Sequence, residues 1–500
     1  MPPALAARAP PATLPAVSDT EQVDVLVVGA GLSGIAAGYH LQTTCPNKSY
    51  AILEGRQAIG GTWDLFRYPG IRSDSDMYTL GFSFRPWTGK KSIADGADIR
   101  AYIQETAEVY GIHDKIRFGH MVQSATWSSD DAAWTVTARR TEDGEEVTFR
   151  CCFLFLCAGY YDYAEGYTPD FEGVNDFAGT IVHPQKWPED LDYRGKRVVV
   201  IGSGATAVTL VPAMAEEAAK VTMLQRSPSF LLARPPEDRV AQWLTDKLGD
   251  EAGYAVSRFK NVALGLAFFE ACRRYPDSMR NLLYMGIKAQ LGDDYDLSPH
   301  FTPAYNPWEQ RLCLTPDGDF FEAMKDGKVE VVTDHIARFT QTGLALESGD
   351  ALDADIIVTA TGLKLRFLGG LDIEVDGEAI DPSELFTYRG CMLSEVPNLA
   401  MAFGYTNASW TLKCDLICDY VARLLDHMDR HGYRKVVPRP DDPNMEPEPL
   451  VDFSSGYFKR SLHELPKQGP RKPWRLYQNY FKDVVSIRLE RFTDDALEMS

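Results

Sequence analysis

Apolar residues are arranged along this chain in short, dense runs that are followed by glycine. The run at 23–28 leads into a Gly-rich turn and then into apolar positions at helical spacing, and the run at 198–201 does the same. Two further runs, FLFLCAG at 153–159 and ADIIVTATG at 354–362, have the length of buried strands and also end in Gly. This pattern predicts an α/β fold with two Rossmann-like dinucleotide-binding domains, and the chain is expected to cross between them at the two further runs.

The first Gly-rich turn reads GAGLSG and has glycine at the three positions of a dinucleotide fingerprint. In such a turn Gly29 permits the tight bend, Gly31 lets the backbone approach a pyrophosphate, and Gly34 permits close packing of the helix on the strand. The helix that follows would present its N-terminal N–H groups to the phosphates. We therefore expect Gly29, Gly31, Ser33 and Gly34 to bind a dinucleotide.

An acidic residue follows this loop at the distance expected for a group that binds ribose. The apolar strand YAILE ends in Glu54, twenty residues past Gly34. A carboxylate at this position accepts hydrogen bonds from a ribose 2′-hydroxyl and repels a 2′-phosphate. The first site therefore suits FAD or NAD rather than NADP.

The second Gly-rich turn reads GSGATA and is followed by different ribose chemistry. The next strand ends in Gln225, with Arg226 and Ser227 directly after it, so the acid is missing and a guanidinium stands nearby. Arginine forms paired hydrogen bonds with phosphate, so this loop is expected to prefer NADPH over NADH. The residues expected to contact that coenzyme are Gly202, Ser203, Gly204, Ala205, Thr206, Ala207, Arg226 and Ser227.

The composition fits a large globular enzyme and argues against some partners. A chain of 500 residues exceeds what one hydrophobic core usually organises, so two or more domains are expected. The net charge of −20 argues against a nucleic-acid partner, because phosphate contacts require clustered Lys and Arg. The nine cysteines include no CxxC pair, so we expect reduced, structural thiols, no metal site and a cytoplasmic location.

Two segments outside these motifs bear on targeting. Residues 1–21 are rich in Ala and Pro without a continuous apolar stretch, which predicts a disordered tail rather than a signal peptide. The stretch VALGLAFFEAC at 262–272 is too short and too interrupted to span a bilayer. We interpret it as a core helix, with peripheral contact to a membrane surface or an apolar substrate passage as the alternatives.

A linker motif and the cysteine positions narrow the class of flavoprotein. A disulfide reductase would need a redox Cys pair, and the segment 60–74 that follows the first loop contains no cysteine. Between the two loops, residues 177–188 read FAGTIVHPQKWP and match F-x-G-x-x-x-H-x-x-x-W-P. This motif resembles the fingerprint of the type I flavoprotein Baeyer–Villiger monooxygenases. Further similarity, including that to the ethionamide-activating subgroup of this family, lies at 60–74, 67–87, 300–313, 360–362, 404–413 and 464–480.

The resemblance implies an FAD domain built from both chain ends, with an NADPH domain inserted between them. Carried to this chain, the FAD domain would comprise 22–170 and 365–500. The NADPH domain would comprise 171–364, with a helical insertion at about 235–300.

In the family, the fingerprint histidine lies on the interdomain linker and supports domain movement. The resemblance therefore implies that His183 anchors one domain, while Trp187 and Pro188 stiffen the turn. Together with Phe177 and Gly179, these residues are expected to act as a hinge rather than as reacting groups.

The resemblance also implies the reacting residues. Arg311 matches the family's active-site arginine, and Asp74 matches the acid that holds this arginine beside the flavin. Sequence alone leaves an ordinary salt bridge open, because 237 residues separate the two. The resemblance further places Arg72 and Ser73 near NADPH, Thr62, Trp63, Asp64 and Leu65 over the isoalloxazine, Val122 at the adenine, and Asn407 and Ser409 at the flavin pyrimidine.

The function implied by the resemblance is an NADPH- and O₂-dependent oxidation of a small ketone to an ester or lactone through a C4a-peroxyflavin. Oxygenation of a sulfide or thioamide is compatible with the same catalyst. The alternatives are an N- or S-oxygenating flavin monooxygenase without ketone activity, and a dinucleotide-binding sensor without turnover. Trp187, Pro188 and Arg311 favour the first of these three, and the native substrate cannot be read from the sequence.

Overall fold

The computed structural model describes residues 20–451, 455–489, 491–492 and 494–500. Of the predicted tail at 1–21, residues 1–19 lie outside the described residues. The first strand begins at Glu21, so this last residue of the predicted tail belongs to a sheet.

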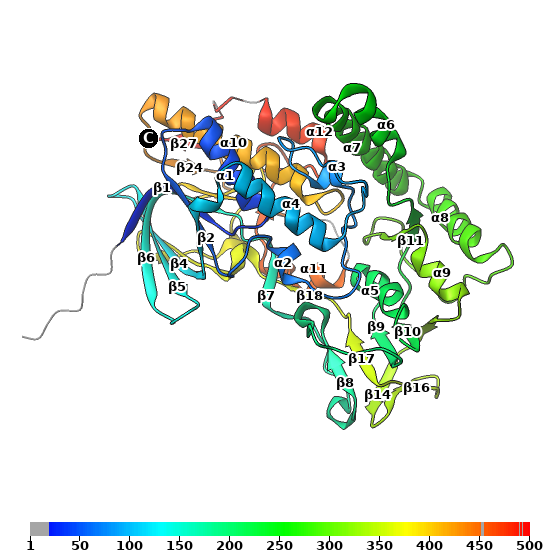
Figure 1. The fold of residues 1–500 in the computed structure, drawn as a ribbon. Coiled ribbons are helices and arrows are strands. Elements are labelled where there is room, and N and C mark those ends of the chain that lie inside the picture. The colour runs from blue at the N-terminus through cyan, green and yellow to red at the C-terminus, as the bar shows by residue number, and fades with distance from the viewer. Residues whose placement is uncertain (1–19, 452–454, 490, 493) are drawn as a thin grey trace, which may run out of the picture.

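A nine-stranded sheet is assembled from both ends of the chain (Figure 1). Its first strand lies between two parallel neighbours, and most apolar residues of all three are buried, as the dense apolar runs predict. In spatial order the strands are β20 (Glu378–Ala379), β19 (Asp372–Val375), β4 (His120–Ser128), β5 (Ala133–Arg140), β6 (Glu146–Leu156), β1 (Glu21–Val28), β2 (Tyr50–Glu54) and β3 (Ile116–Phe118), with β23 (Leu399–Met401) also paired to β6.

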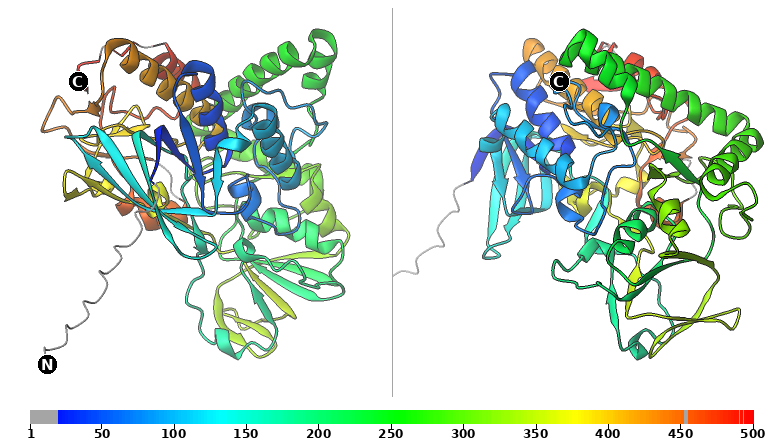
Figure 2. Two further views of the ribbon diagram at one scale, coloured as in Figure 1. Left: turned by 60° about the vertical axis from the view of Figure 1, so that its left-hand side comes forward. Right: turned by 45° about the vertical axis from the view of Figure 1, so that its right-hand side comes forward.

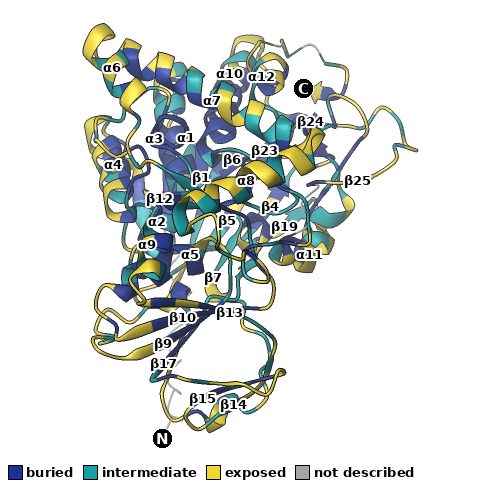
Figure 3. Cartoon of the chain, turned by 90° about the vertical axis from the view of Figure 1, so that its right-hand side faces the viewer, coloured by how far each residue is buried: buried dark blue, intermediate teal, exposed yellow. Residues whose placement is uncertain are grey.

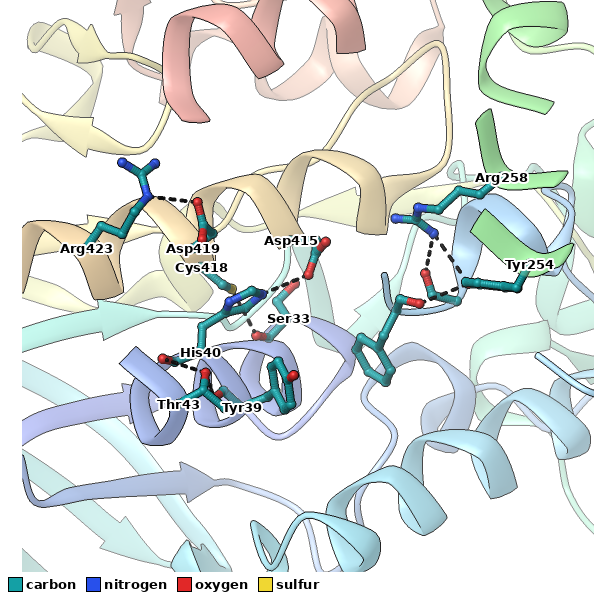
Figure 4. A network of polar contacts seen from close by, with 12 residues as sticks. Ser33, Tyr39, His40, Thr43, Tyr254, Arg258, Asp415, Cys418, Asp419 and Arg423 are labelled. Atoms are coloured by element: carbon teal, nitrogen blue, oxygen red, sulfur yellow. Dashed lines mark hydrogen bonds and ion pairs between the residues drawn. The ribbon is translucent and has the colours of Figure 1, made fainter. Parts of the chain in front are cut away.

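Helices α1 (Leu32–Thr44), α4 (Gly96–Val109) and α10 (Trp410–His431) contribute apolar residues to one core with this sheet. Cys414 and Cys418 lie on the buried side of α10, as the sequence predicts. A buried polar contact joins the first helix to the last long one, because His40 Nε2 lies 2.9 Å from Asp415 Oδ1 (Figure 4). Residues 375 positions apart are thereby held side by side, which places the start of α10 next to the first Gly loop.

A second sheet has five strands, all parallel, and lies in a separate part of the molecule (Figure 2). In spatial order these are β13 (Val329–Thr333), β10 (Lys220–Gln225), β9 (Arg197–Ile201), β17 (Ile356–Thr359) and β8 (Thr180–Val182). Helices α5 (Ala205–Ala215) and α9 (Asp319–Lys325) share its core, and a small sheet of β14 (Ile336–Thr340), β15 (Gly343–Leu346) and β16 (Ala351–Asp353) adds a second apolar cluster.

The two sheets are joined by two short strands that pair with each other. β7 (Tyr161–Gly166) leaves the first sheet after β6, and β18 (Leu363–Leu365) returns from the second sheet after β17. The runs at 153–159 and 354–362 thus end where the chain passes between the two sheets. The remaining short elements are α2 (Thr62–Leu65), α3 (Met77–Leu80), α11 (Gly456–Ser461), α12 (Tyr480–Asp483), β11 (Leu231–Arg234), β12 (Cys313–Pro316), β21 (Thr387–Tyr388), β22 (Met392–Leu393), β24 (Val436–Pro438), β25 (Glu448–Pro449), β26 (Lys467–Gln468) and β27 (Leu497–Met499).

Three helices follow β11 and project to one side: α6 (Arg239–Leu248), α7 (Asp250–Arg274) and α8 (Pro276–Leu291). The core interpretation of 262–272 is wrong, because only Val262 and Cys272 of that stretch are buried and Leu264 is 62% exposed. Figure 3 shows the exposed positions on these helices. None of the described helices has both the length and the apolar character needed to cross a bilayer.

Candidate active site

A cavity of about 1390 Å³ extends along the carboxyl ends of both sheets and is lined by both Gly loops. This is where parallel α/β sheets commonly bind ligands. The residues of the sequence-based site that line it are Gly29, Gly31, Ser33, Glu54, Thr62, Trp63, Arg72, Ser73, Asp74, Val122, Gly202, Ser203, Gly204, Ala205, Thr206, Arg226, Ser227 and Arg311.

The first loop has the close approaches that its glycines were predicted to allow. Gly29 has φ +103°, and a Cβ atom there would lie 2.6 Å from the carbonyl oxygen of Cys157. A Cβ at Gly34 would lie 1.8 Å from the carbonyl oxygen of Gly29, so α1 packs directly against the loop. Gly34 itself therefore lies beneath the cavity and not on its wall.

The carboxylate at the end of β2 is held by the backbone of the loop region. Glu54 Oε2 accepts a hydrogen bond from the Ala30 N–H at 2.8 Å, and Oε1 accepts one from the Arg56 N–H at 2.8 Å. Burial raises the pKa of Glu54, and these two backbone donors act in the opposite direction. A carboxylate positioned between a Gly loop and the cavity fits the ribose of a dinucleotide such as FAD.

The second loop exposes its backbone to the cavity. Gly202 has φ +135° and approaches the Ala360 carbonyl so closely that a Cβ would lie 2.3 Å from its oxygen. No atom lies within 4 Å of a Cβ placed at Gly204, which leaves room for a ligand at that backbone. Ala207 is fully buried under the loop and does not line the cavity.

The residues after β10 differ sharply in their surroundings. Gln225 is 1% exposed, and its amide donates to the His300 carbonyl at 2.8 Å and to Thr333 Oγ1 at 2.9 Å. Arg226 is exposed at the cavity and has no ion pair with any described residue. A cationic side chain with unused donors beside the second loop fits a phosphate group, as in NADPH.

Arg311 and Asp74 meet in the cavity although the sequence separates them widely. Arg311 Nε lies 2.6 Å from Asp74 Oδ2, and Nη2 donates to Asp74 Oδ1 at 3.0 Å, so the pair is bidentate. Nη1 makes a longer contact of 3.4 Å to the carbonyl of Thr406. Loss of hydration opposes the charge, but the Asp74 carboxylate raises the pKa of Arg311 on balance. The guanidinium is therefore a fixed cation with N–H groups left for a ligand.

Three tyrosines lie in the same cavity as this pair, and none of them was assigned a role from the sequence. Tyr160, Tyr161 and Tyr457 all line the cavity, and the hydroxyls of Tyr160 and Tyr161 lie 3.1 Å apart. Burial raises the pKa of all three, so the hydroxyls stay protonated and can donate hydrogen bonds. The signal for the first two was the segment YYDYAEGY, whereas no motif pointed to Tyr457.

Asp64 and Leu65, which the resemblance places over the isoalloxazine, do not line the cavity. The Asp64 carboxylate is 3% exposed and pairs with Arg56 at 2.7 Å, with Arg100 at 3.4 Å and with Arg67. Leu65 packs against the apolar cluster of the second sheet. The three arginines thus hold the Asp64 carboxylate and stabilise the α2 turn. Thr62 and Trp63, by contrast, line the cavity.

The loop before α10 contains buried polar atoms that lack a partner in the described protein. The Ser409 hydroxyl and the Asn407 side-chain oxygen are both in this state, while the Asn407 amide donates to the Gln478 carbonyl at 2.8 Å. Neither residue is on the cavity wall, although Ala408 and Trp410 are. The start of α10 is therefore at the cavity, but neither of the two polar residues that the resemblance places at the flavin is on the cavity wall.

The fingerprint histidine joins the segments that connect the two sheets. His183 Nε2 donates to the Gly362 carbonyl at 3.2 Å, and Nδ1 accepts from the Gln185 N–H at 3.2 Å. A Cβ at Gly166 would lie 1.9 Å from the imidazole, so glycine is needed there. Burial lowers the pKa of His183, in keeping with the neutral form that these contacts require.

The other fingerprint residues pack within the part of the molecule that contains the second sheet. Phe177 is 9% exposed and contacts Phe339, with ring centres 6.5 Å apart. A Cβ at Gly179 would lie 2.5 Å from the Asp355 carbonyl oxygen. Trp187 packs against the apolar cluster under β9 and β10. Neither these three residues nor His183 line the cavity.

Two family models match the chain. Residues 27–88 match an NAD(P)-binding Rossmann-like domain, and residues 92–243 match a flavin-binding monooxygenase-like family. Among solved structures, an oxidized steroid monooxygenase bound to NADP is similar with a TM-score of 0.70 and 25% identity, covering 84% of this chain and 88% of that one. An ε-caprolactone-bound cyclohexanone monooxygenase has a TM-score of 0.72 at 20% identity, covering 96% and 100%, which supports the shared fold.

Whole-length relatives are more similar in sequence. The FAD-containing monooxygenase EthA of Mycobacterium tuberculosis is 54% identical over 96% of this chain and 98% of its own length. The putative FAD-containing monooxygenase MymA of the same species is 49% identical, covering 95% and 97%. The probable FAD-binding monooxygenase AlmA of an Acinetobacter species is 45% identical, covering 96% of each chain. The resemblance inferred from the motifs is therefore confirmed, and the chain belongs to the FAD-containing monooxygenases of the EthA group.

Proposed function

We propose that this enzyme uses NADPH and O₂ to convert small ketones into esters or lactones, a Baeyer–Villiger oxidation. The observation that carries the proposal is the bidentate Arg311–Asp74 pair, which lies in the same cavity as both Gly loops. The FAGTIVHPQKWP segment between the loops supports it, because that segment matches the fingerprint of the Baeyer–Villiger family.

Each of the two Gly loops would bind one cofactor. FAD would be held by Gly29, Gly31 and Glu54, and NADPH by the second loop with Arg226 at its 2′-phosphate. When bound, FAD supplies the redox chemistry that takes a hydride from NADPH and delivers one oxygen atom of O₂ to the substrate. The protein contributes position, charge and exclusion of water.

Arg311 would stabilise the negative charge that develops on the ketone oxygen during the reaction. A guanidinium has five N–H groups, and the contacts with Asp74 and Thr406 use three of them, so two can face a ligand. Asp74 fixes the plane of the guanidinium, so little reorganisation is needed when charge develops. The protonated hydroxyls of Tyr160, Tyr161 and Tyr457 would complete a polar but water-poor surface next to it.

The fingerprint residues would link the two halves of this site. His183 ties the segment before β9 to the return strand through the Gly362 carbonyl, so it acts as a positioning residue for the NADPH side of the cavity. All nine cysteines are unpaired, which supports a reducing, cytoplasmic setting for the reaction.

Sulfide or thioamide oxygenation at the same cavity is the second activity to measure, because sulfur accepts oxygen from the same type of catalyst. The test is a panel of ketones and sulfides, with each product quantified against NADPH consumed. Ester formation from at least one ketone supports the proposal. Sulfoxide without any ester would assign the enzyme to the N- or S-oxygenating class, and NADPH oxidation with peroxide alone would exclude both activities.

A further inference from the structure

The guanidinium of Arg311 is supported at two ends, and Asp74 provides only one of these supports. Asp74 is bound through Nε and Nη2, whereas Nη1 contacts the Thr406 carbonyl at 3.4 Å. Thr406 lies between β23 and α10 in residues 402–409, which we call the entry loop. Tyr405 of this loop lines the cavity. The position of the entry loop therefore decides where the Thr406 carbonyl meets the guanidinium.

Gln478 holds the entry loop from outside the cavity. Its Oε1 accepts hydrogen bonds from the Thr406 N–H at 3.1 Å and from the Thr406 hydroxyl at 3.4 Å. Its backbone carbonyl accepts a third from the Asn407 amide at 2.8 Å. The Nε2 group of Gln478 has no partner among the described residues, so the side chain acts on the loop as an acceptor. Two consecutive loop residues are thus tied to one residue that lies 72 and 71 positions later in the chain.

The backbone around Gln478 is fixed by its own contacts. Gln478 has φ +48°, in the left-handed region that residues other than glycine rarely adopt. Such a conformation persists where the surrounding contacts over-determine it. The next residue, Asn479, caps α12, because its side chain accepts a hydrogen bond from the Lys482 N–H at 3.2 Å. The start of α12 therefore keeps Gln478 in place against the entry loop.

The other end of α12 holds the neighbouring residue of the entry loop. The Tyr405 hydroxyl donates to Asp483 Oδ2 at 2.6 Å, and Lys413 Nζ, near the start of α10, lies 2.7 Å from the same oxygen. Tyr405, Asp483 and Lys413 are all buried. Breaking a contact of a buried carboxylate is costly, because water is not there to replace it. Gln478 and Asp483 thus hold Thr406 and Tyr405 from the two ends of one short helix, and we call Gln478 and Asp483 the clamp.

We propose that the clamp positions Arg311 for catalysis, and that Gln478 is the positioning residue that sets the Thr406 carbonyl. Asp74 fixes one edge of the guanidinium, and the Thr406 carbonyl fixes the remaining end, which determines the N–H groups that face a ligand. A donor displaced from its place stabilises a developing charge less well. This inference rests on the proposed function, because the clamp acts on the reaction only through Arg311.

The first measurement asks whether the clamp holds the loop, and it does not depend on the reaction. Gln478→Met keeps the length of the side chain and removes the acceptor, and Tyr405→Phe removes the hydroxyl at the other end of the clamp. In the FAD-loaded, full-length enzyme, hydrogen exchange followed by mass spectrometry should become faster across 402–409 in both variants. The expected increase is about 3- to 10-fold for the loss of one hydrogen bond. The matched control is Gln42→Met, which should exchange like the parent across 402–409, since the Gln42 amide also links two segments but lies outside the cavity.

The second measurement asks whether the loop positions Arg311. The ratio of ester formed to NADPH consumed should fall about 3- to 10-fold in Gln478→Met, with peroxide released instead, and should stay at the parent value in Gln42→Met. In an Arg311→Lys background, Gln478→Met should cause no further fall, because lysine has no guanidinium to orient. The FAD content and the thermal unfolding midpoint of each variant report loss of the fold separately.

Three outcomes would overturn the proposal. Unchanged exchange across 402–409 in both variants would show that the clamp does not hold the loop. Faster exchange with an unchanged ratio of ester to NADPH would show that the loop does not position Arg311. An equal fall of this ratio in the parent and Arg311→Lys backgrounds would assign Gln478 to packing. A parent enzyme that forms no ester from any ketone would contradict the proposed reaction instead, and the exchange rates, which need no substrate, distinguish that failure from a failure of the clamp.

Discussion

Replacing Arg311 by alanine should separate the consumption of NADPH from the formation of ester. The side chain has two contacts with Asp74, of 2.6 and 3.0 Å, and leaves N–H groups for the reacting oxygen. Removing one positioned donor to a developing oxyanion typically costs about 2.7–4 kcal/mol, or about 100- to 1000-fold in rate. We therefore expect ester formation to fall by at least about 100-fold, with part of the NADPH oxidation retained and peroxide released.

Asp74→Asn distinguishes charge from orientation. The amide can keep one hydrogen bond to Arg311 but loses the charge-assisted bidentate contact, which is worth roughly 1.5–3 kcal/mol. The rate of ester formation should therefore fall by roughly 10- to 150-fold, and NADP⁺ affinity, measured by fluorescence titration, should change less than the rate.

The matched control is Arg197→Ala. Arg197 forms a similar bidentate pair with Asp355, at 3.1 and 3.4 Å, but lies at the surface outside the cavity. This variant should make ester at the parent rate. The assay follows NADPH at its absorbance maximum and quantifies ester and peroxide at the same time points. Ester formation at the parent rate by Arg311→Ala would refute the electrostatic role.

Three further predictions address the coenzyme, the connector and the buried framework. Arg226→Ala should weaken NADPH binding more than NADH binding by about 1.5–3 kcal/mol, measured as the two dissociation constants, and equal weakening would show that Arg226 does not contact the 2′-phosphate. His183→Ala should retain FAD but slow turnover, whereas loss of FAD with unfolding would indicate a packing role. Burial lowers the pKa of His183, so the unfolded chain binds a proton at this residue before the folded protein does as the pH falls below about 6.5. The free energy of unfolding of the parent should therefore decrease in this pH range. The decrease should be smaller for His183→Ala. Lys413→Met should lower the unfolding free energy by roughly 3–5 kcal/mol, because it leaves the Asp483 carboxylate, 2% exposed and 2.7 Å from the lysine, without its cation. The thermal unfolding midpoint of Lys413→Met should rise again in the double variant with Asp483→Leu, and an unchanged midpoint in the single variant would refute this account.

Local sequence patterns were sufficient for the two dinucleotide loops. The strand, the Gly-rich turn and the helix are consecutive there, and the close approaches at Gly29 and Gly202 are made by backbone that the neighbouring apolar runs supply. The acid at Glu54 and the cation at Arg226 follow each loop at a fixed distance. The Gly loops, the acid and the cation lie within one βαβ unit each, so periodicity and spacing could reveal them, whereas the carbonyls of Cys157 and Ala360 that Gly29 and Gly202 approach come from segments distant in the sequence.

Local sequence patterns could not predict the contacts between segments that lie far apart in the chain. Arg311 and Asp74 could be paired only through the family resemblance, since nothing in their spacing indicates that they meet. Asp64 lies in a motif that predicted contact with the flavin, but arginines at other positions of the chain draw its carboxylate away from the cavity. The sequence could not show where those arginines would be.

Helix α7 illustrates a different limit. Its apolar residues predicted a core position, because apolar composition alone does not say which side of a helix meets the protein. The side that meets the protein is chosen by Arg258 and Asn261, whose partners lie about 180 residues earlier in the chain. The apolar side therefore remained at the surface.

The central claim is that one oxygen atom of O₂ is inserted into a ketone at the Arg311–Asp74 site. Its most direct test supplies the FAD-loaded enzyme with NADPH, an aryl ketone and isotopically heavy O₂, and analyses the product by mass spectrometry. The account predicts an ester that contains one heavy oxygen atom, formed in step with one NADPH consumed. Ester without the heavy atom, or NADPH consumption that yields only heavy hydrogen peroxide with every ketone supplied, would contradict it.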